Sequence, residues 1–133
     1  MSGWSREKRS AVAWIDENSA RMAEMSDALF EWAEPGLREY KSSRLLMSYM
    51  VEKGFDVEEG VSGMPTAFVA RWGKEGPEIG FFAEYDATPG HSQKVVPWEE
   101  PAVPHGPGFT DAHNMLGVAS CFAALALKEA AVE

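Results

Sequence analysis

The spacing of hydrophobic positions predicts a helix in each of two segments of the N-terminal half. Near the start, apolar side chains recur at steps of three, four and seven residues, which places them on one stripe of a helix. These are Ile15, Met22, Met25, Leu29 and Trp32. Pro35 and Gly36 should stop this helix, because neither residue continues one readily. A second helix is expected over residues 42–53, with Gly54 at its C-terminal cap.

Three apolar segments in the middle of the chain are predicted to be strands. They are residues 55–58, 66–72 and 78–85. The link "GKEGP" between the second and the third predicts a hairpin. The third segment is apolar without alternation over residues 79–83, a pattern typical of a strand covered on both faces.

A long loop and an apolar helix follow. Residues 87–110 hold five prolines and predict a loop; loops of this length are rare in a compact domain unless they are functional. The final helix should run from about His113 to the C-terminus, and its stretch "MLGVASCFAALAL" is apolar nearly all round, which predicts burial between layers. The expected strands do not cover such a helix. We therefore expect the 133 residues to be part of a larger folding unit, completed by a C-terminal portion, another chain or a second copy.

Composition and charge narrow the class of protein. The chain is 45% hydrophobic and 11% aromatic, as in globular proteins. Its net charge of -9 is spread along the sequence and argues against nucleic acid or an anionic membrane as a partner. The lone Cys121 excludes an internal disulfide and fits a reducing compartment. With no secretory signal and no apolar window of the ~18 residues that a membrane span needs, we expect a cytoplasmic protein.

The first candidate for chemistry is the stretch "GFTDAHNMLGVAS", in which Asp111 and His113 lie where the loop turns into the final helix. A carboxylate and an imidazole both bind divalent metals, and the start of a helix fixes their geometry. The alternative is that Asp111 or Thr110 caps the helix and His113 is an ordinary residue of its first turn. The local pattern alone favours this alternative, because Asp-x-His is short and common.

Two further acids end the third predicted strand. Glu84 and Asp86 are two residues apart, so both should point to one side of that strand. Acids at the C-terminal end of an apolar strand lie where open α/β sheets place ligands, and they suit metal binding or the orientation of a histidine ligand. The alternative is an ordinary polar strand end before a turn. Combined with Asp111 and His113, the pair favours a metal site.

The remaining reactive side chains have simpler explanations. His91 and His105 lie in the proline-rich loop and should be exposed and inert. Cys121 lies among apolar residues of the final helix and should be a buried, unreactive thiol. Glu99 and Glu100 are adjacent in a loop, which gives no geometric reason to treat them as an acid/base pair.

Four segments occur in an order that resembles a known family. They are "AEPGLREYKSS", "GVSGMPTAFVARWG", "IGFFAEYDATPGHSQ" and "DAHNMLGVAS". From about Ala33 onward the chain resembles the N-terminal portion of the aminoacylase/carboxypeptidase-type dinuclear metallopeptidases, a family of amidohydrolases, and is nearest to its aminobenzoyl-glutamate utilisation branch. The resemblance implies an α/β fold, with residues 1–133 forming the N-terminal segment of a zinc-peptidase-like, three-layer α/β/α catalytic domain. The rest of that domain and the dimerisation domain are absent from the sequence.

The same resemblance implies roles for the four candidate residues. Asp86 matches the catalytic acid that orients a metal ligand, and His113 matches a ligand histidine. Asp111 stands where the nearest branch usually has a ligand cysteine and other branches have a bridging aspartate, which favours manganese, or zinc in a mixed site. Glu84 stands where many members carry a ligand histidine, so it is the weaker candidate for metal contact. The complete site would hold two divalent ions.

The function implied is metal-dependent hydrolysis of an amide or related C–N bond in a small acyl-amino-acid or aromatic substrate. In the family, the general base is the first of two adjacent glutamates downstream of the ligand aspartate, and no such pair follows Asp111. We therefore expect activity only together with the missing C-terminal part, in a homo-oligomer. The alternative is a non-catalytic family member that acts as an interaction module through its uncovered final helix.

Overall fold

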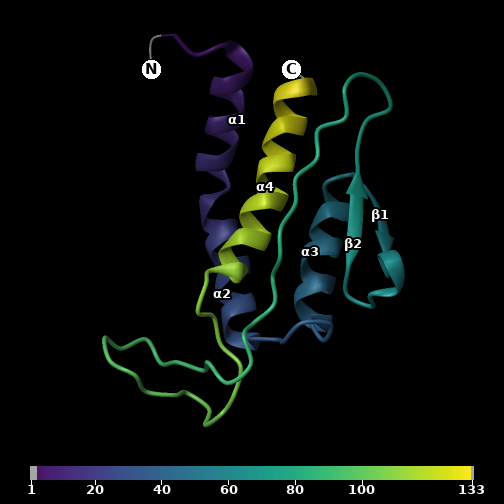
Figure 1. Cartoon of the computed structure of the whole chain (residues 1–133). Helices are drawn as coiled ribbons and strands as arrows, with labels where there is room; N and C mark the ends of the chain where they lie inside the picture. Colours follow the sequence, from purple (N-terminus) through teal and green to yellow (C-terminus); the bar gives the residue numbers. More distant parts are fainter. Residues whose placement is uncertain (1–2, 133) are drawn as a thin grey trace.

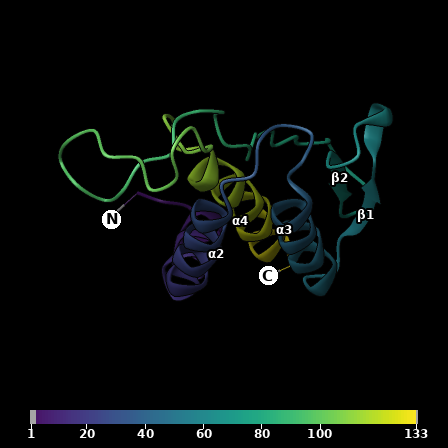
Figure 2. The ribbon, with the colours of Figure 1, turned by 90° about the horizontal axis from the view of Figure 1, so that it is seen from below.

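The computed structural model describes residues 3–132, which form four α-helices, one 3-10 turn and two short strands. In chain order these are α1 (Arg6–Glu17), α2 (Ser19–Trp32), α3 (Tyr40–Glu52), β1 (Asp56–Glu59), η1 (Val61–Gly63), β2 (Phe68–Arg71) and α4 (His113–Val132). Helix α4 packs against α1 and α2 on one side and α3 on the other (Figure 1). Seen from below, α2, α4 and α3 lie in a row and the small sheet flanks α3 (Figure 2).

The predicted first helix is two helices, because the chain leaves helical geometry at Asn18. The Asn18 side-chain amide donates to the carbonyl oxygen of Trp14 at 2.8 Å, and its backbone N–H approaches the same oxygen at 3.1 Å. Such local bonds let asparagine end a helix. The prediction of an uninterrupted helix is therefore wrong, whereas the predicted stripe is right at its centre, where Met25 and Leu29 are buried.

The hydrophobic core lies between α1 and the row formed by α2, α4 and α3. Phe122 of α4 is fully buried and stacks on Tyr49 of α3, with ring centroids 5.3 Å apart. The ring of Trp14 in α1 also packs against Phe122, with ring centroids 5.7 Å apart. The other buried apolar residues of the core are Met25, Leu29, Leu46, Met50, Phe55, Val118 and Leu125. Aromatic rings of two other helices, α1 and α3, thus pack against one side chain of α4, which holds that helix in place.

The two strands form an antiparallel pair in which Asp56 faces Arg71 and Glu59 faces Phe68. The predictions of strands at residues 55–58 and 66–72 are therefore confirmed to within a few residues. The predicted hairpin between β2 and residues 78–85 is wrong, because β1 is the partner of β2 in the described part of the chain.

Residues 78–85 are extended but do not form a strand, so this prediction is also wrong. The segment runs beside α4 (Figure 1), where the Ser120 hydroxyl donates to the carbonyl of Phe82 at 3.4 Å. A strand needs a neighbour for its backbone groups, and no strand within residues 3–132 pairs with this segment. Its side chains are not covered on both faces, since Ile79 is 59% and Phe82 84% exposed.

Helix α4 begins at His113 as predicted, but it is not buried all round. Val118 and Leu125 face the core, whereas Met115 and Leu116 are exposed. Contrary to the expectation from composition, α4 is long and apolar enough to cross a membrane. Length and composition alone are weak evidence for a membrane-spanning helix, because the core helix of a soluble protein can have the same length and composition.

The loop predicted at residues 87–110 is confirmed and contains no helix or ladder strand. Its two arms are nevertheless tied together, since Thr88 and Gly108 exchange backbone hydrogen bonds of 2.8 and 3.0 Å. A Cβ atom at Gly108 would lie 2.1 Å from the carbonyl oxygen of His91, so only glycine permits this approach. The loop therefore returns the chain to the same end of the helices that it left.

The structure contains both helices and a small sheet, which agrees with the predicted α/β class. The three-layer α/β/α arrangement stays a prediction, because the described strands form a single pair.

Candidate metal centre

All four predicted site residues meet at the first turn of α4. The Nδ1 atom of His113 lies 2.9 Å from Oδ1 of Asp86. Its Nε2 atom lies 3.1 Å from Oε2 of Glu84 and 3.0 Å from Oδ2 of Asp111. One imidazole therefore contacts three carboxylates that come from two separate segments of the chain.

Extended backbone explains why Glu84 and Asp86 reach the same histidine. Successive side chains of an extended segment point to opposite sides, so Glu84 and Asp86 share one side and Tyr85 between them points away. The Tyr85 hydroxyl donates to the carbonyl of Thr66, and its ring lies 6.2 Å from that of Phe68. Anchoring Tyr85 on the β2 side thus presents the two acids to His113, as their spacing in the sequence predicts.

Gly117 lets α4 approach this segment closely. A Cβ atom at Gly117 would lie 2.8 Å from Cβ of Tyr85 and 3.2 Å from the carbonyl oxygen of Glu84. A larger side chain there would have to push the helix and the extended segment apart. Gly117 lies one helical turn after His113, so this contact sets the separation between the imidazole and the acids.

The three carboxylates change the protonation of His113. Partial burial lowers the pKa of the imidazole, but the hydrogen bond to Asp86 and the negative charges of Asp111, Asp86 and Glu84 together outweigh it. The result is a pKa raised above the ordinary histidine value. Without a metal, the imidazole is therefore held as a cation among carboxylates over a wider pH range.

The alternative explanation of Asp111 and Thr110 as helix caps finds no support. The Asp111 carboxylate is directed at His113, and the Thr110 hydroxyl lies 3.1 Å from that of Thr88. The first intrahelical bond of α4 runs from the backbone N–H of Leu116 to the carbonyl of Ala112 at 2.8 Å. The aspartate side chain is thus available for a ligand role.

The donor set fits a divalent metal in its chemistry but does not complete a site. Within residues 3–132, no group of three or more His, Cys, Asp or Glu side chains is arranged so that it could hold an ion by itself. The contacts of 3.0 and 3.1 Å at His113 Nε2 are direct hydrogen-bond distances. They also match the spacing of neighbouring donors around one ion with bonds of ~2.1 Å. An imidazole whose Nδ1 is held by a carboxylate, as by Asp86 here, is the usual form of a histidine metal ligand.

The other reactive groups are arranged as the sequence predicts. His91 and His105 are exposed. Cys121 is partly buried, and burial raises the pKa of its thiol to about 11, which favours the predicted unreactive cysteine. The Glu100 carboxylate accepts a hydrogen bond from Trp98 Nε1 at 2.8 Å and pairs with Lys94 on the loop surface, so its contacts are structural.

Most of this chain matches part of a curated protein. It is 33% identical over 116 residues to a p-aminobenzoyl-glutamate hydrolase subunit of Escherichia coli (strain K12). The chain is similar to part of this hydrolase subunit. The match supports the predicted resemblance to the aminobenzoyl-glutamate branch. The matched part covers 86% of this chain but only 24% of the relative, so the chain spans about a quarter of the relative's length. No family model matches the chain.

Two residues of this hydrolase-related chain support the site without having been singled out from the sequence. Asn114 is buried, and its Nδ2 atom donates to the Ser26 hydroxyl at 3.0 Å, which fastens the start of α4 to α2. Gly117 provides the close approach described above. Both lie in the run "HNMLG", which carried the resemblance, but nothing in the local pattern distinguishes a docking asparagine from an exposed one.

Proposed function

We propose that this chain supplies part of the metal site of an amidohydrolase that cleaves an amide or related C–N bond. The observation that carries the proposal is the setting of His113. Its Nδ1 atom is held by Asp86, while its Nε2 atom faces Glu84 and Asp111. The hydrolase name of the relative supports the reaction class.

Each residue has a separate task in this proposal. His113 and Asp111 bind a divalent ion, and Glu84 is the weaker, third donor. Asp86 positions the imidazole by holding Nδ1, which keeps Nε2 free for the ion. A carboxylate-rich donor set suits manganese, or zinc in a mixed site, and the complete centre would hold two ions. A bound ion would lower the pKa of a coordinated water and polarise the scissile carbonyl.

The general base and the further ligands of such a centre are not identified among the described residues. The three carboxylates named above are the ones that contact His113. We propose that a C-terminal portion or a second copy supplies the other groups. Two exposed apolar surfaces are available for such a partner. They are the unpaired segment with Ile79 and Phe82, and the face of α4 with Met115 and Leu116. We propose that the active form is a cytoplasmic homo-oligomer built through these surfaces.

The substrate class follows from the relative. Its name states that it acts on p-aminobenzoyl-glutamate, an amide between an aromatic acid and an amino acid. We propose a small acyl-amino-acid or aromatic amide as the substrate here. A role as a non-catalytic interaction module is less favoured, because the matched relative belongs to a hydrolase.

Metal binding tests this function. We expect the incomplete donor set of the chain to bind Mn²⁺ or Zn²⁺ weakly in a calorimetric titration, and His113→Gln or Asp111→Asn to weaken that binding at least ~10-fold, because each removes a ligand. The matched control is His91→Gln, which removes an exposed loop histidine and should leave metal affinity unchanged. Equal metal affinity in the wild type and in both ligand variants would contradict the proposal.

A further inference from the structure

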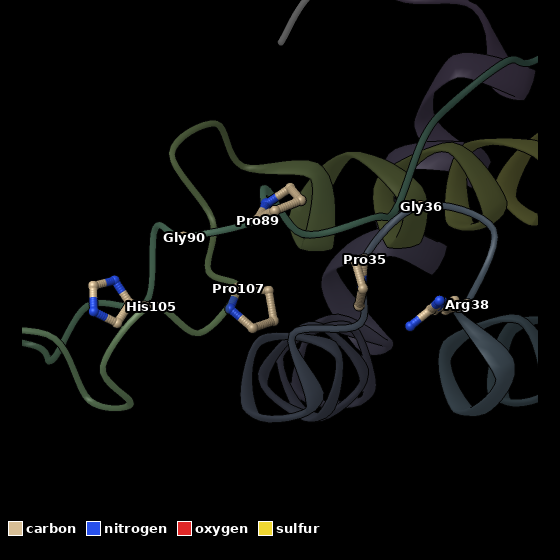
Figure 3. A pocket seen from close by; sticks show the side chains of 7 residues that line it. All are labelled: Pro35, Gly36, Arg38, Pro89, Gly90, His105 and Pro107. Carbon is tan, nitrogen blue, oxygen red and sulfur yellow. The ribbon is translucent and has the colours of Figure 1, made fainter.

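A second feature, a hollow of about 320 Å³, lies at the end of the molecule where the loop joins the helices. Pro35, Pro89 and Pro107 form much of its wall (Figure 3). Arg38 and His105 lie at its opposite ends (Figure 3). The hollow thus has an apolar middle with a polar, nitrogen-bearing side chain at each end. Its size is at the lower end of the range for sites that bind small molecules.

The hollow adjoins the candidate metal centre. The backbone N–H of Ala87 donates to the carbonyl of Glu34 at 2.8 Å, and Pro35 forms a parallel bridge with Ala87. This bridge holds Gly36, which lines the hollow, against Asp86. A Cβ atom built on Gly36 would lie 3.7 Å from Oδ2 of Asp86. A molecule in the hollow would therefore lie beside the carboxylate that positions His113.

Arg38 is an unpaired cation at this place. Within residues 3–132, its guanidinium group makes no hydrogen bond or ion pair. The nearby acids of the same segment are already engaged: Glu34 accepts from the backbone N–H of Ser42 at 2.8 Å, and Glu39 accepts from the Thr66 hydroxyl at 2.5 Å. The chain as a whole is acidic, with a net charge of -9, so it does not attract anions in general. A guanidinium group with all its donors available can still bind an anion at this one place.

Unusual backbone geometry occurs at the same place. Leu37, next to Arg38, has φ of 63°, and His105 has φ of 58°. Left-handed geometry at residues with a Cβ is unfavourable, and it persists where the surrounding structure imposes it, often at ligand clamps. The surrounding structure therefore holds the backbone in an unfavourable conformation at His105 and at Leu37, the neighbour of Arg38.

We infer that this hollow binds a small organic acid, with its carboxylate on Arg38 and its apolar, ring-sized body against the prolines. The inference rests on the proposed hydrolase function, because it assigns the hollow as the place where an acidic substrate is held next to the metal centre. Carboxylate recognition by a guanidinium is strong because the hydrogen bonds are charge-assisted and can form in pairs. The proline rings offer apolar surface for the rest of the molecule.

Binding of benzoate and benzamide to the full chain tests the inference. The two probes share a ring, and only benzoate carries a charge. In an NMR titration we expect benzoate to shift the amide signals of Gly36 and Gly90, and to bind at least ~10-fold more tightly than benzamide. Arg38→Gln should weaken benzoate binding about 10-fold and leave benzamide unaffected. The control Arg44→Gln removes an exposed arginine of α3, outside the hollow, and should change neither affinity.

Three results would overturn the inference: no detectable benzoate binding, equal affinity for benzoate and benzamide, or unchanged benzoate affinity in Arg38→Gln. The test is separate from that of the proposed function, because benzoate binding to Arg38 requires no metal. If the hollow fails to bind benzoate while His113→Gln still abolishes Mn²⁺ binding, only the present inference falls. If benzoate binds as expected but no ion does, the hydrolase proposal falls instead.

Discussion

The Nδ1 atom of His113 lies 2.9 Å from Oδ1 of Asp86, although 27 residues separate the two in the sequence. The loop of residues 87–110 leaves the helices after Asp86 and returns shortly before His113, and the exchange of hydrogen bonds between Thr88 and Gly108 closes it at its base. This closure brings the acid and the imidazole together. The pairing fixes the orientation of the ring.

Asp86→Ala should weaken metal binding without unfolding the chain. The imidazole would lose the partner that holds Nδ1, and such losses typically cost about 10–100-fold in metal affinity. Calorimetric titration with Mn²⁺ and Zn²⁺ measures the effect. The control is Asp56→Ala, which removes an exposed acid of β1 and should leave the affinity unchanged. An affinity within about twofold of the wild type in Asp86→Ala would show that Asp86 does not position the ligand.

The stability of the metal-free chain should fall as the pH rises through neutrality. The pKa of His113 is raised in the folded chain, chiefly by Asp86 and the neighbouring carboxylates, against the lowering effect of partial burial. A raised pKa means that the folded state binds the proton more tightly than the unfolded state. The resulting stabilisation is complete below the unfolded value near 6.5 and is lost as the pH passes the folded value.

Urea unfolding in the presence of a chelator, between about pH 5.5 and 9, measures this dependence. His113→Gln should flatten the profile, since glutamine does not titrate. A wild-type stability that increases between about pH 6 and 8 would contradict the assignment.

Phe122→Ala should destabilise the chain by about 3–5 kcal/mol, because it empties the space between Tyr49 and Trp14. Phe82→Ala removes the same ring from a site that is 84% exposed and should change the free energy of unfolding by less than about 0.5 kcal/mol. Denaturant titration of both variants gives the comparison. Similar losses in the two would mean that the described core is not the one that stabilises the chain.

Gly117→Val should weaken both the fold and the metal centre. The added side chain would collide with Tyr85 and with the carbonyl of Glu84, so we expect a loss of about 1–3 kcal/mol and reduced Mn²⁺ affinity. Ala119→Val introduces the same β-branched residue on the exposed side of α4, where the cost should be about 0.5 kcal/mol. A Gly117 variant with unchanged stability and metal affinity would show that α4 and the extended segment are not in close contact.

Cys121 should react slowly with iodoacetamide in the folded chain. Its pKa is raised to about 11 by burial, so on the order of one thiol in a thousand is ionised at pH 8. Urea exposes the thiol and returns its pKa towards about 8.5, which should accelerate alkylation by at least about 100-fold. Mass spectrometry of timed samples measures both rates. Equal rates with and without urea would place Cys121 outside the core.

The helices were predictable where the apolar spacing is regular, and less so where a single residue redirects the backbone. The periodic stripe through Met25 and Leu29 predicted burial correctly, since periodicity reports which side of a helix meets apolar neighbours. The break at Asn18 depends on a side-chain hydrogen bond to Trp14, for which the periodic pattern carries no signal. The expected strand at residues 78–85 failed for another reason. Its composition favours a strand, but pairing depends on a neighbour that the described residues do not supply.

The sequence by itself determined the candidate donors and their local arrangement. The two-residue spacing of Glu84 and Asp86 fixes their common side, because side chains alternate along extended backbone. Only the tertiary structure decided that both acids meet His113, and that Arg38 lines the same hollow as Gly36, which lies against Asp86. Those contacts depend on the path of the loop and on how closely α4 approaches Tyr85 at Gly117. Such distances arise from packing between segments far apart in the chain, and local sequence spacing does not encode them.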